Sequence, residues 1–172
     1  TFSLNDIVAV HGFDPTEVLR FYAVISSEGG STADFYIDDV LLEFTSSDND
    51  PTPDPDPDPS EAPNPIFEND FEEFTKNITV QASVAGLGRR STDIAHSGVY
   101  SYRVAGRSAD WEGMRIDPID LHYIAKNIDN TYYVSAFVNP SETATFFWTV
   151  GVYYSDDYTE VRVELPSTEC VA

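Results

Sequence analysis

The sequence of 172 residues contains one cysteine and only nine Lys and Arg residues, against thirty Asp and Glu residues. The lone Cys170 excludes an intrachain disulfide framework and is most simply interpreted as a small buried hydrophobe. The net charge of −21 argues against nucleic acid and anionic membrane surfaces as partners, because both are bound through Lys and Arg patches. No apolar run approaches the roughly eighteen residues of a membrane span, so we expect no membrane insertion.

Catalytic signatures are also scarce. The three histidines have no metal-ligand spacing, and neither a nucleophile elbow nor a glycine-rich phosphate loop occurs. Glycoside hydrolysis needs two carboxylates roughly 5 to 10 Å apart. An acidic chain always offers such pairs, for instance Glu112 with Asp117, so their presence is uninformative. We therefore expect a protein that is not an enzyme.

What the chain does have is a large apolar content with strand periodicity. Hydrophobic residues make up 41% and aromatic residues 13%, which is enough for a packed core. In the run YTEVRVEL, residues 158–165, valines and a leucine alternate with Glu and Arg, as in a half-buried strand. Helix signals are weak, apart from a short turn within residues 118–128. Further strands are expected at residues 18–25, 34–44, 99–104, 131–138 and 145–154. Many short strands separated by turn residues predict an all-β, antiparallel β-sandwich of the jelly-roll type.

The segment of residues 45–65 interrupts this pattern. Its core, SSDNDPTPDPDPDPSEAPNP, holds seven of the eleven prolines and six acidic residues with no basic residue. Proline fixes φ and removes a hydrogen-bond donor, and like charges repel, so the segment is predicted to be an extended linker.

Motifs on both sides of the linker carry a resemblance to a known family. After the linker come IFENDFEEF, the run Ala95-His96-Ser97-Gly98, a strand with alternating Tyr100 and Tyr102, and the spaced pair Trp111 and Gly113. These resemble the first half of a xylan-binding carbohydrate-binding module of family twenty-two, with families four and nine similar. Before the linker, TFSL, LRFYAVI and ADFYIDDVLLEF resemble the second half of such a module.

The order of the two halves is therefore inverted. Residues 1–44 resemble the C-terminal portion of a module, and residues 66–172 the N-terminal portion of a following module. A half-sandwich cannot bury its apolar face, so each portion needs a complement. The complement comes from the same chain, as in a circular permutation, or from neighbouring copies or modules in a filament or tandem array. The expectation here is that the linker joins parts of two different sandwiches in a linear repeat.

The resemblance also implies a ligand. Such modules bind β-linked polysaccharides by stacking the apolar faces of sugar rings on aromatic side chains. By this resemblance Trp111 is the platform aromatic, Tyr154 is a second aromatic of the cleft, and Arg90 or its neighbour Arg89 donates to sugar hydroxyls. The simpler interpretation places each aromatic in the core and the arginines in solvent.

A structural Ca²⁺ is implied in the same way. Glu68 in IFEND and Asp38 and Asp39 in YIDDV match the calcium ligands of the family. An Asp-Asp pair in a buried strand is costly unless a cation or hydrogen-bond donors compensate it. Solvated edge carboxylates are the alternative.

The functional expectation is a non-catalytic, secreted or cell-surface module, or a tandem repeat of such modules, that binds a β-1,4-linked polysaccharide such as xylan or β-glucan. The alternative is a structural subunit of an extracellular filament or repeat array that has kept the fold without the sugar site. The triplet Asn77-Ile78-Thr79 is a glycosylation sequon, which also occurs by chance.

Overall fold

The fold is given by a computed structural model, which describes residues 2–3, 7, 11–12, 18–45, 65–73, 77–82, 86–120, 131–154 and 159–172. The elements of these residues are strands: β1 (Phe2–Ser3), β2 (Val18–Ser27), β3 (Phe35–Thr45), β4 (Phe67–Asn69), β5 (Ile78–Gln81), β6 (Gly88–Ser91), β7 (Ser101–Val104), β8 (Gly113–Asp120), β9 (Thr131–Pro140), β10 (Ala144–Tyr154), β11 (Thr159–Glu164) and β12 (Thr168–Cys170).

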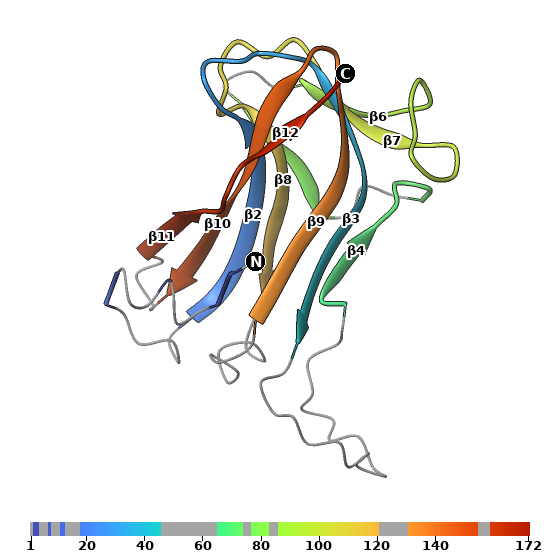
Figure 1. Ribbon diagram of the computed structural model, residues 1–172. Coiled ribbons are helices and arrows are strands. Elements are labelled where there is room, and N and C mark those ends of the chain that lie inside the picture. The colour runs from blue at the N-terminus through green and yellow to red at the C-terminus, as the bar shows by residue number, and fades with distance from the viewer. Residues whose placement is uncertain are drawn as a thin grey trace.

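The strands form two antiparallel sheets of six strands each, which face each other as a β-sandwich (Figure 1). In the first, the β9 sheet, the order is β1-β9-β3-β7-β6, and β4 also pairs with β3. In the second, the β10 sheet, the order is β11-β10-β2-β8-β5, and β12 also pairs with β10. The prediction of an all-β antiparallel sandwich is confirmed.

The core lies between the two sheets and follows the alternation of side chains along each strand. On β2, Phe21, Ala23 and Ile25 point inward, and they meet inward residues of β3 such as Phe35 and Ile37. On β11 the predicted alternation holds, since the valines are buried or half-buried whereas the intervening Glu and Arg side chains are exposed. Each predicted strand coincides with a strand of the structure.

The two portions that flank the linker complete a single sandwich within this chain. β2 lies between β8 and β10, and β3 is hydrogen-bonded to β4, β7 and β9 (Figure 1). The two long strands from before the linker, β2 and β3, are therefore interior strands flanked by strands from after it. The expected split of the two portions between two different sandwiches is not what this chain forms, because its own strands supply the complement that each portion needs.

Some predicted features fall outside the described residues. The linker from residue 46 to residue 64 and most of the predicted turn at residues 118–128 are among them. The first three residues of that turn instead end strand β8. The described part of the chain contains no helix that is long and apolar enough to cross a membrane.

Candidate functional site

A cleft of about 390 Å³ opens on the outer face of the β10 sheet. Residues of opposite parity to the core line it, because alternate side chains of β2, β10 and β11 point away from the sandwich. Its wall combines three aromatic side chains with hydrogen-bond donors and acceptors. We call this hollow the Trp111 cleft; it is lined by Tyr22, Ser26, Gln81, Trp111, Phe147, Thr149, Arg162 and Glu164.

The floor of the cleft is built around Tyr22 and Gly151, which lie directly opposite each other on β2 and β10. A Cβ atom on Gly151 would come within 2.1 Å of the Tyr22 ring, so only glycine leaves room for the ring to lie across the strand. The Arg115 guanidinium lies 4.5 Å from the Tyr22 ring centroid, and the Tyr153 ring lies 5.6 Å away. Neighbouring side chains thus hold Tyr22 in place.

Trp111 stands at the cleft on the loop that precedes β8, and its side chain is 45% exposed. Buried Arg107 holds this loop from within. Its guanidinium donates to the carbonyls of Glu112, Ala33 and Asp110 at 2.6 to 2.7 Å, and to Ser27 Oγ at 2.7 Å. Burial lowers the pKa of Arg107 more than the nearby carboxylates raise it. Arginine nevertheless remains charged.

The loop is braced by a second buried charge and by the end of β2. Glu112 is fully buried, and its carboxylate accepts from the Ser108 amide at 2.5 Å and the Ala109 amide at 3.1 Å. Ser26 Oγ donates to the Trp111 carbonyl at 3.1 Å, and the Gly30 amide donates to the Asp110 carboxylate at 3.0 Å. A loop held by this many hydrogen bonds presents its indole in a preorganised position.

The charges beside the cleft are mixed. Arg162 donates to the Glu160 carboxylate at 2.8 Å. Burial raises the pKa of Glu160, but the hydrogen bond and the positive charge of Arg162 contribute most to the opposing effects that outweigh burial, so the Glu160 pKa is lowered. Burial, with the Glu160 charge, raises the pKa of Tyr22 well above its ordinary value. The cleft therefore offers both cationic and anionic groups, which suits a neutral ligand with many hydroxyls better than an ion.

Of the three residues predicted to bind a ligand, the structure places only Trp111 at the cleft. Tyr154 packs against the hydrophobic core, and its neighbour Tyr153 is the one on the outer face, where Arg115 contacts its hydroxyl at 3.4 Å. Arg90 belongs to β6 of the other sheet. There its guanidinium lies 3.5 Å from the Tyr100 ring centroid and donates to the Glu72 carbonyl, which gives it a local bracing role.

The predicted calcium ligands are engaged differently. Asp38 is 1% exposed, and its carboxylate accepts the amides of Asp39, His96 and Ser97 at 2.8 to 3.2 Å. Asp39 receives Ser97 Oγ at 2.7 Å and lies 2.6 Å from His96 Nδ1. A buried carboxylate can be compensated by a cation or by hydrogen-bond donors, and in this structure amide donors compensate Asp38.

Glu68 is an exposed residue of β4 and faces another hollow, of about 600 Å³, together with Asp70, Glu72 and Glu73. Within the described ranges no group of three or more His, Cys, Asp or Glu residues could hold a metal ion. The residues named for calcium thus do not form a common ligand set in this structure, and calcium binding stays a prediction.

Sequence reasoning missed most of the cleft. The sequence predicts that Tyr22, Phe147 and Arg162 lie in strands, but it does not indicate a site for them. For Arg162 the alternation with the inward-facing Val161 does predict an outward-facing side chain. On β10 the same alternation places Tyr153 on the outer face and Tyr154 on the core side. The register between β10 and β2 shifts only after Tyr153. What no pattern within one strand indicates is which outward residues of different strands lie side by side.

The fold and the cleft define a β-sandwich with a preorganised aromatic site on one outer face. A scan against protein-family models and searches of curated proteins and of solved structures found no match.

Proposed function

We propose that this chain is a non-catalytic, extracellular carbohydrate-binding module that binds a β-1,4-linked polysaccharide, such as xylan or β-glucan, in the Trp111 cleft. The observation that carries the proposal is the half-exposed Trp111, held on a loop by buried Arg107 and Glu112 beside a cleft with polar and aromatic walls. An exposed tryptophan on a rigid loop gains free energy when a ligand covers it.

The chemistry of the cleft fits a sugar. The C–H faces of a pyranose ring are apolar and slightly positive, whereas the face of an indole is negative, so the two stack. Gln81, Thr149 and Arg162 supply donors, and Glu164 supplies an acceptor, for the hydroxyls at the rim of the ring. A neutral polymer is also insensitive to the net charge of −21, which would repel an acidic one.

Affinity electrophoresis in gels that contain xylan, β-glucan or cellulose tests the proposal. We expect at least one of these polymers to retard the native protein. Trp111→Ala should weaken binding by about 1 to 3 kcal/mol, the range of an aromatic hot spot. Because the ring is exposed, the free energy of unfolding should change by no more than about 0.5 kcal/mol.

The matched control is Phe137→Ala, which removes an aromatic ring that is 38% exposed on the other sheet. This variant should bind as the native protein does. No retardation by any polymer, with the fold intact by circular dichroism, would refute the proposal. A large stability loss in Trp111→Ala with unchanged binding would assign the ring to packing instead.

A further inference from the structure

The outer face of the β10 sheet carries a row of uncharged side chains that extends beyond the Trp111 cleft. Alternate residues of β10 point outward, and we call four of them the β10 row: Phe147, Thr149, Gly151 and Tyr153. Phe147 and Thr149 line the cleft, whereas Tyr153 lies past it. These three side chains are only partly buried, so each has surface that a ligand can cover.

Tyr22 fills the gap that Gly151 leaves in the β10 row. A Cβ atom on Gly151 would lie 2.1 Å from Cζ of Tyr22, so the ring reaches across from β2 to this position. The same ring lines the cleft and lies 5.6 Å from the Tyr153 ring. Arg115 contacts both tyrosines, at 4.5 Å from the Tyr22 ring centroid and 3.4 Å from the Tyr153 hydroxyl. Tyr153 is therefore the next aromatic ring beyond the cleft.

Charged side chains stand on both sides of the β10 row. On one side is β11, whose outward residues from Thr159 to Glu164 are all charged: Glu160, Arg162 and Glu164. On the other side, beyond β2, is β8 with Arg115 and Asp117. The uncharged row thus runs parallel to the strands between two polar rims. Phe147 and Tyr153 are six residues apart on β10, which is roughly 20 Å at a rise of about 3.4 Å per residue, so several sugar rings fit in line.

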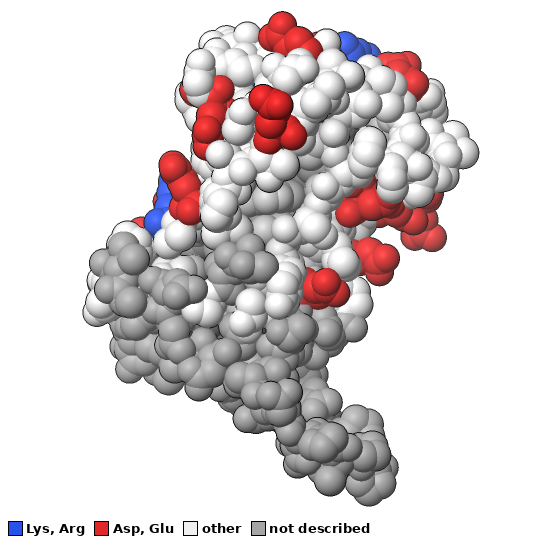
Figure 2. Space-filling view, in the orientation of Figure 1, with Lys and Arg blue, Asp and Glu red and all other residues white. Residues whose placement is uncertain are grey.

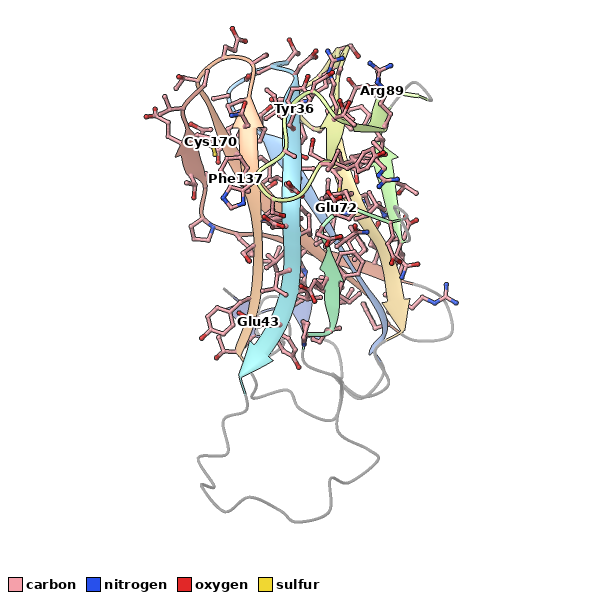
Figure 3. All side chains as sticks on the ribbon, turned by 90° about the vertical axis from the view of Figure 1, so that its right-hand side faces the viewer. Tyr36, Glu43, Glu72, Arg89, Phe137 and Cys170 are labelled. Carbon is pink, nitrogen blue, oxygen red and sulfur yellow. The ribbon has the colours of Figure 1, made fainter. Side chains whose placement is uncertain are left out.

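The outer face of the β9 sheet has no comparable row among the described residues. Figure 3 shows Tyr36, Phe137 and Glu43 spread along this face. His96, from residues 92–99, stacks on Phe137 at 4.2 Å, and Glu43 places a charge on the same face. An extended neutral ligand would meet a loop and a charge there. The β10 sheet is therefore the face that suits such a ligand.

We propose that the β10 row extends the polysaccharide site, so that a linear, neutral β-1,4-linked chain lies along β10 from Trp111 to Tyr153. This inference rests on the proposed function and names the form of its ligand, which is a stretch of several sugars and not a single sugar or a disaccharide. Sugar rings stack on Trp111 and Tyr153, and Arg162 on the rim between them donates to hydroxyls. The polymer is neutral because the surface is acidic. Figure 2 shows Asp and Glu side chains spread over the face in view with few Lys and Arg, and such a surface repels an acidic polymer.

Isothermal titration calorimetry with linear xylo- and gluco-oligosaccharides, from disaccharide to hexasaccharide, tests this inference. For the native chain we expect the association constant to rise at least about tenfold over the series, because only the longer chains reach both Trp111 and Tyr153. Tyr153→Ala should remove most of this rise, with a loss of about tenfold for the hexasaccharide and less than about twofold for the disaccharide. Trp111→Ala should weaken binding at every length. Tyr153→Phe keeps the ring and loses the hydroxyl contact with Arg115, so it should restore the rise if the ring itself stacks on the sugar.

Two matched variants test the direction of the chain and the role of the ring. Thr79→Ala changes an exposed residue of β5, where a chain that crosses the strands would run, and it should leave the rise with length unchanged. Tyr154→Ala removes the neighbouring ring, which packs on the core, so it should lower the melting temperature but not the rise.

Three outcomes overturn the inference. The first is binding that does not strengthen with length, and the second is an equal loss from Tyr153→Ala at every length. The third is a rise that disappears in Thr79→Ala but not in Tyr153→Ala, because the chain then crosses the strands. In all three cases binding that still depends on Trp111 would uphold the proposed function, whereas no binding of any oligosaccharide by the folded native chain would refute both.

Discussion

Two loops of this sandwich are both held by buried charge, but the charge sits in different places. In residues 107–112 the charged groups, Arg107 and Glu112, belong to the loop itself and fold it around their own hydrogen bonds. In residues 92–99 the charge belongs to strand β3, where Asp38 accepts amides of the loop. The first loop presents Trp111 to a cleft, whereas the second presents His96, which stacks on Phe137 at 4.2 Å.

The comparison shows that a buried acidic residue in such a chain need not belong to a ligand site. A buried carboxylate can bind a cation, form an ion pair or accept backbone amides, and the sequence shows the same Asp or Glu in each case. Here Glu112 and Asp38 both accept amides, and each fixes a loop. Their role is to shape the surface that other side chains then use.

The largest effect that separates the two loops should come from Arg107→Ala. This substitution leaves the carbonyls of Glu112, Ala33 and Asp110 without their guanidinium donor. It also removes the buried positive charge that interacts with the Glu112 carboxylate. We expect a loss of about 4 kcal/mol in the free energy of unfolding, measured by urea denaturation, because such buried networks cost this much to break. Polysaccharide binding should weaken too, since the Trp111 loop loses its support.

Arg103→Ala is the control for this prediction. Arg103 is partly exposed and makes one ion pair, with Asp34 at 3.3 Å, so its loss should cost less than about 1 kcal/mol. Arg107→Lys should fall between the two, because it keeps the charge but not the fork of donors. Equal costs for Arg107→Ala and Arg103→Ala would mean that the buried network does not hold the loop.

The second largest effect should come from Asp38→Ala, which leaves the amides of Asp39, His96 and Ser97 without their acceptor. A hydrogen bond of this kind contributes about 1 kcal/mol, and Asp38 accepts three of them, so we expect a loss of about 3 kcal/mol in total. Thermal and urea unfolding should give the same loss with calcium and with a chelator if the donors alone compensate the carboxylate.

Calcium binding is the alternative explanation for how the Asp38 charge is compensated. If Asp38 or Asp39 binds calcium, a chelator lowers the melting temperature of the native chain, because a ligand of the folded state stabilises it by mass action. Substituting both aspartates by Asn then abolishes the response. A melting temperature that ignores the chelator leaves the amide donors as the whole explanation for Asp38.

The sequence predicted the sandwich because periodicity is a local property of each strand. Val161 and Arg162 alternate in the sequence as they do in the structure. The structure places Trp111 exposed at a cleft, whereas its contact with a sugar, which the resemblance implies, stays a prediction. The role of Asp38 in holding residues 92–99 was not predictable, since two of its three amide donors, those of His96 and Ser97, lie 58 and 59 residues away in the chain. The same holds for Tyr22, whose place in the cleft depends on Gly151 of a strand far along the chain.

The smallest effect, and the one that sharpens the comparison most, concerns Asp39. This residue has a φ of 48°, in the left-handed region, at the point where β3 bulges. Burial raises the pKa of its carboxyl, but hydrogen bonds from His96 and Ser97 outweigh burial, and the pKa is lowered from 3.8. A lowered pKa means that the folded state favours the ionised carboxylate. It stabilises the fold above the unfolded-state pKa, and this stability is lost as the pH falls through the lower folded-state pKa.

Asp39→Asn therefore separates charge from backbone. Asparagine tolerates a positive φ as aspartate does, so the substitution removes the charge without adding strain. Because the site is partly exposed, we expect a loss of only about 0.5 kcal/mol at neutral pH, disappearing as the pH falls below about 3.8. Asp39→Ala should cost about 1 kcal/mol more at every pH, since alanine is strained at this φ. Urea unfolding of the three proteins between pH 7 and pH 3 measures both differences.

Groups such as Glu160, whose pKa is also lowered, are present in all three proteins, so their contribution to the pH dependence cancels in the differences. A cost of Asp39→Asn that persists unchanged at pH 3 would show that the carboxylate acts through its shape and not through its charge, and the contact with His96 would then be no ion pair.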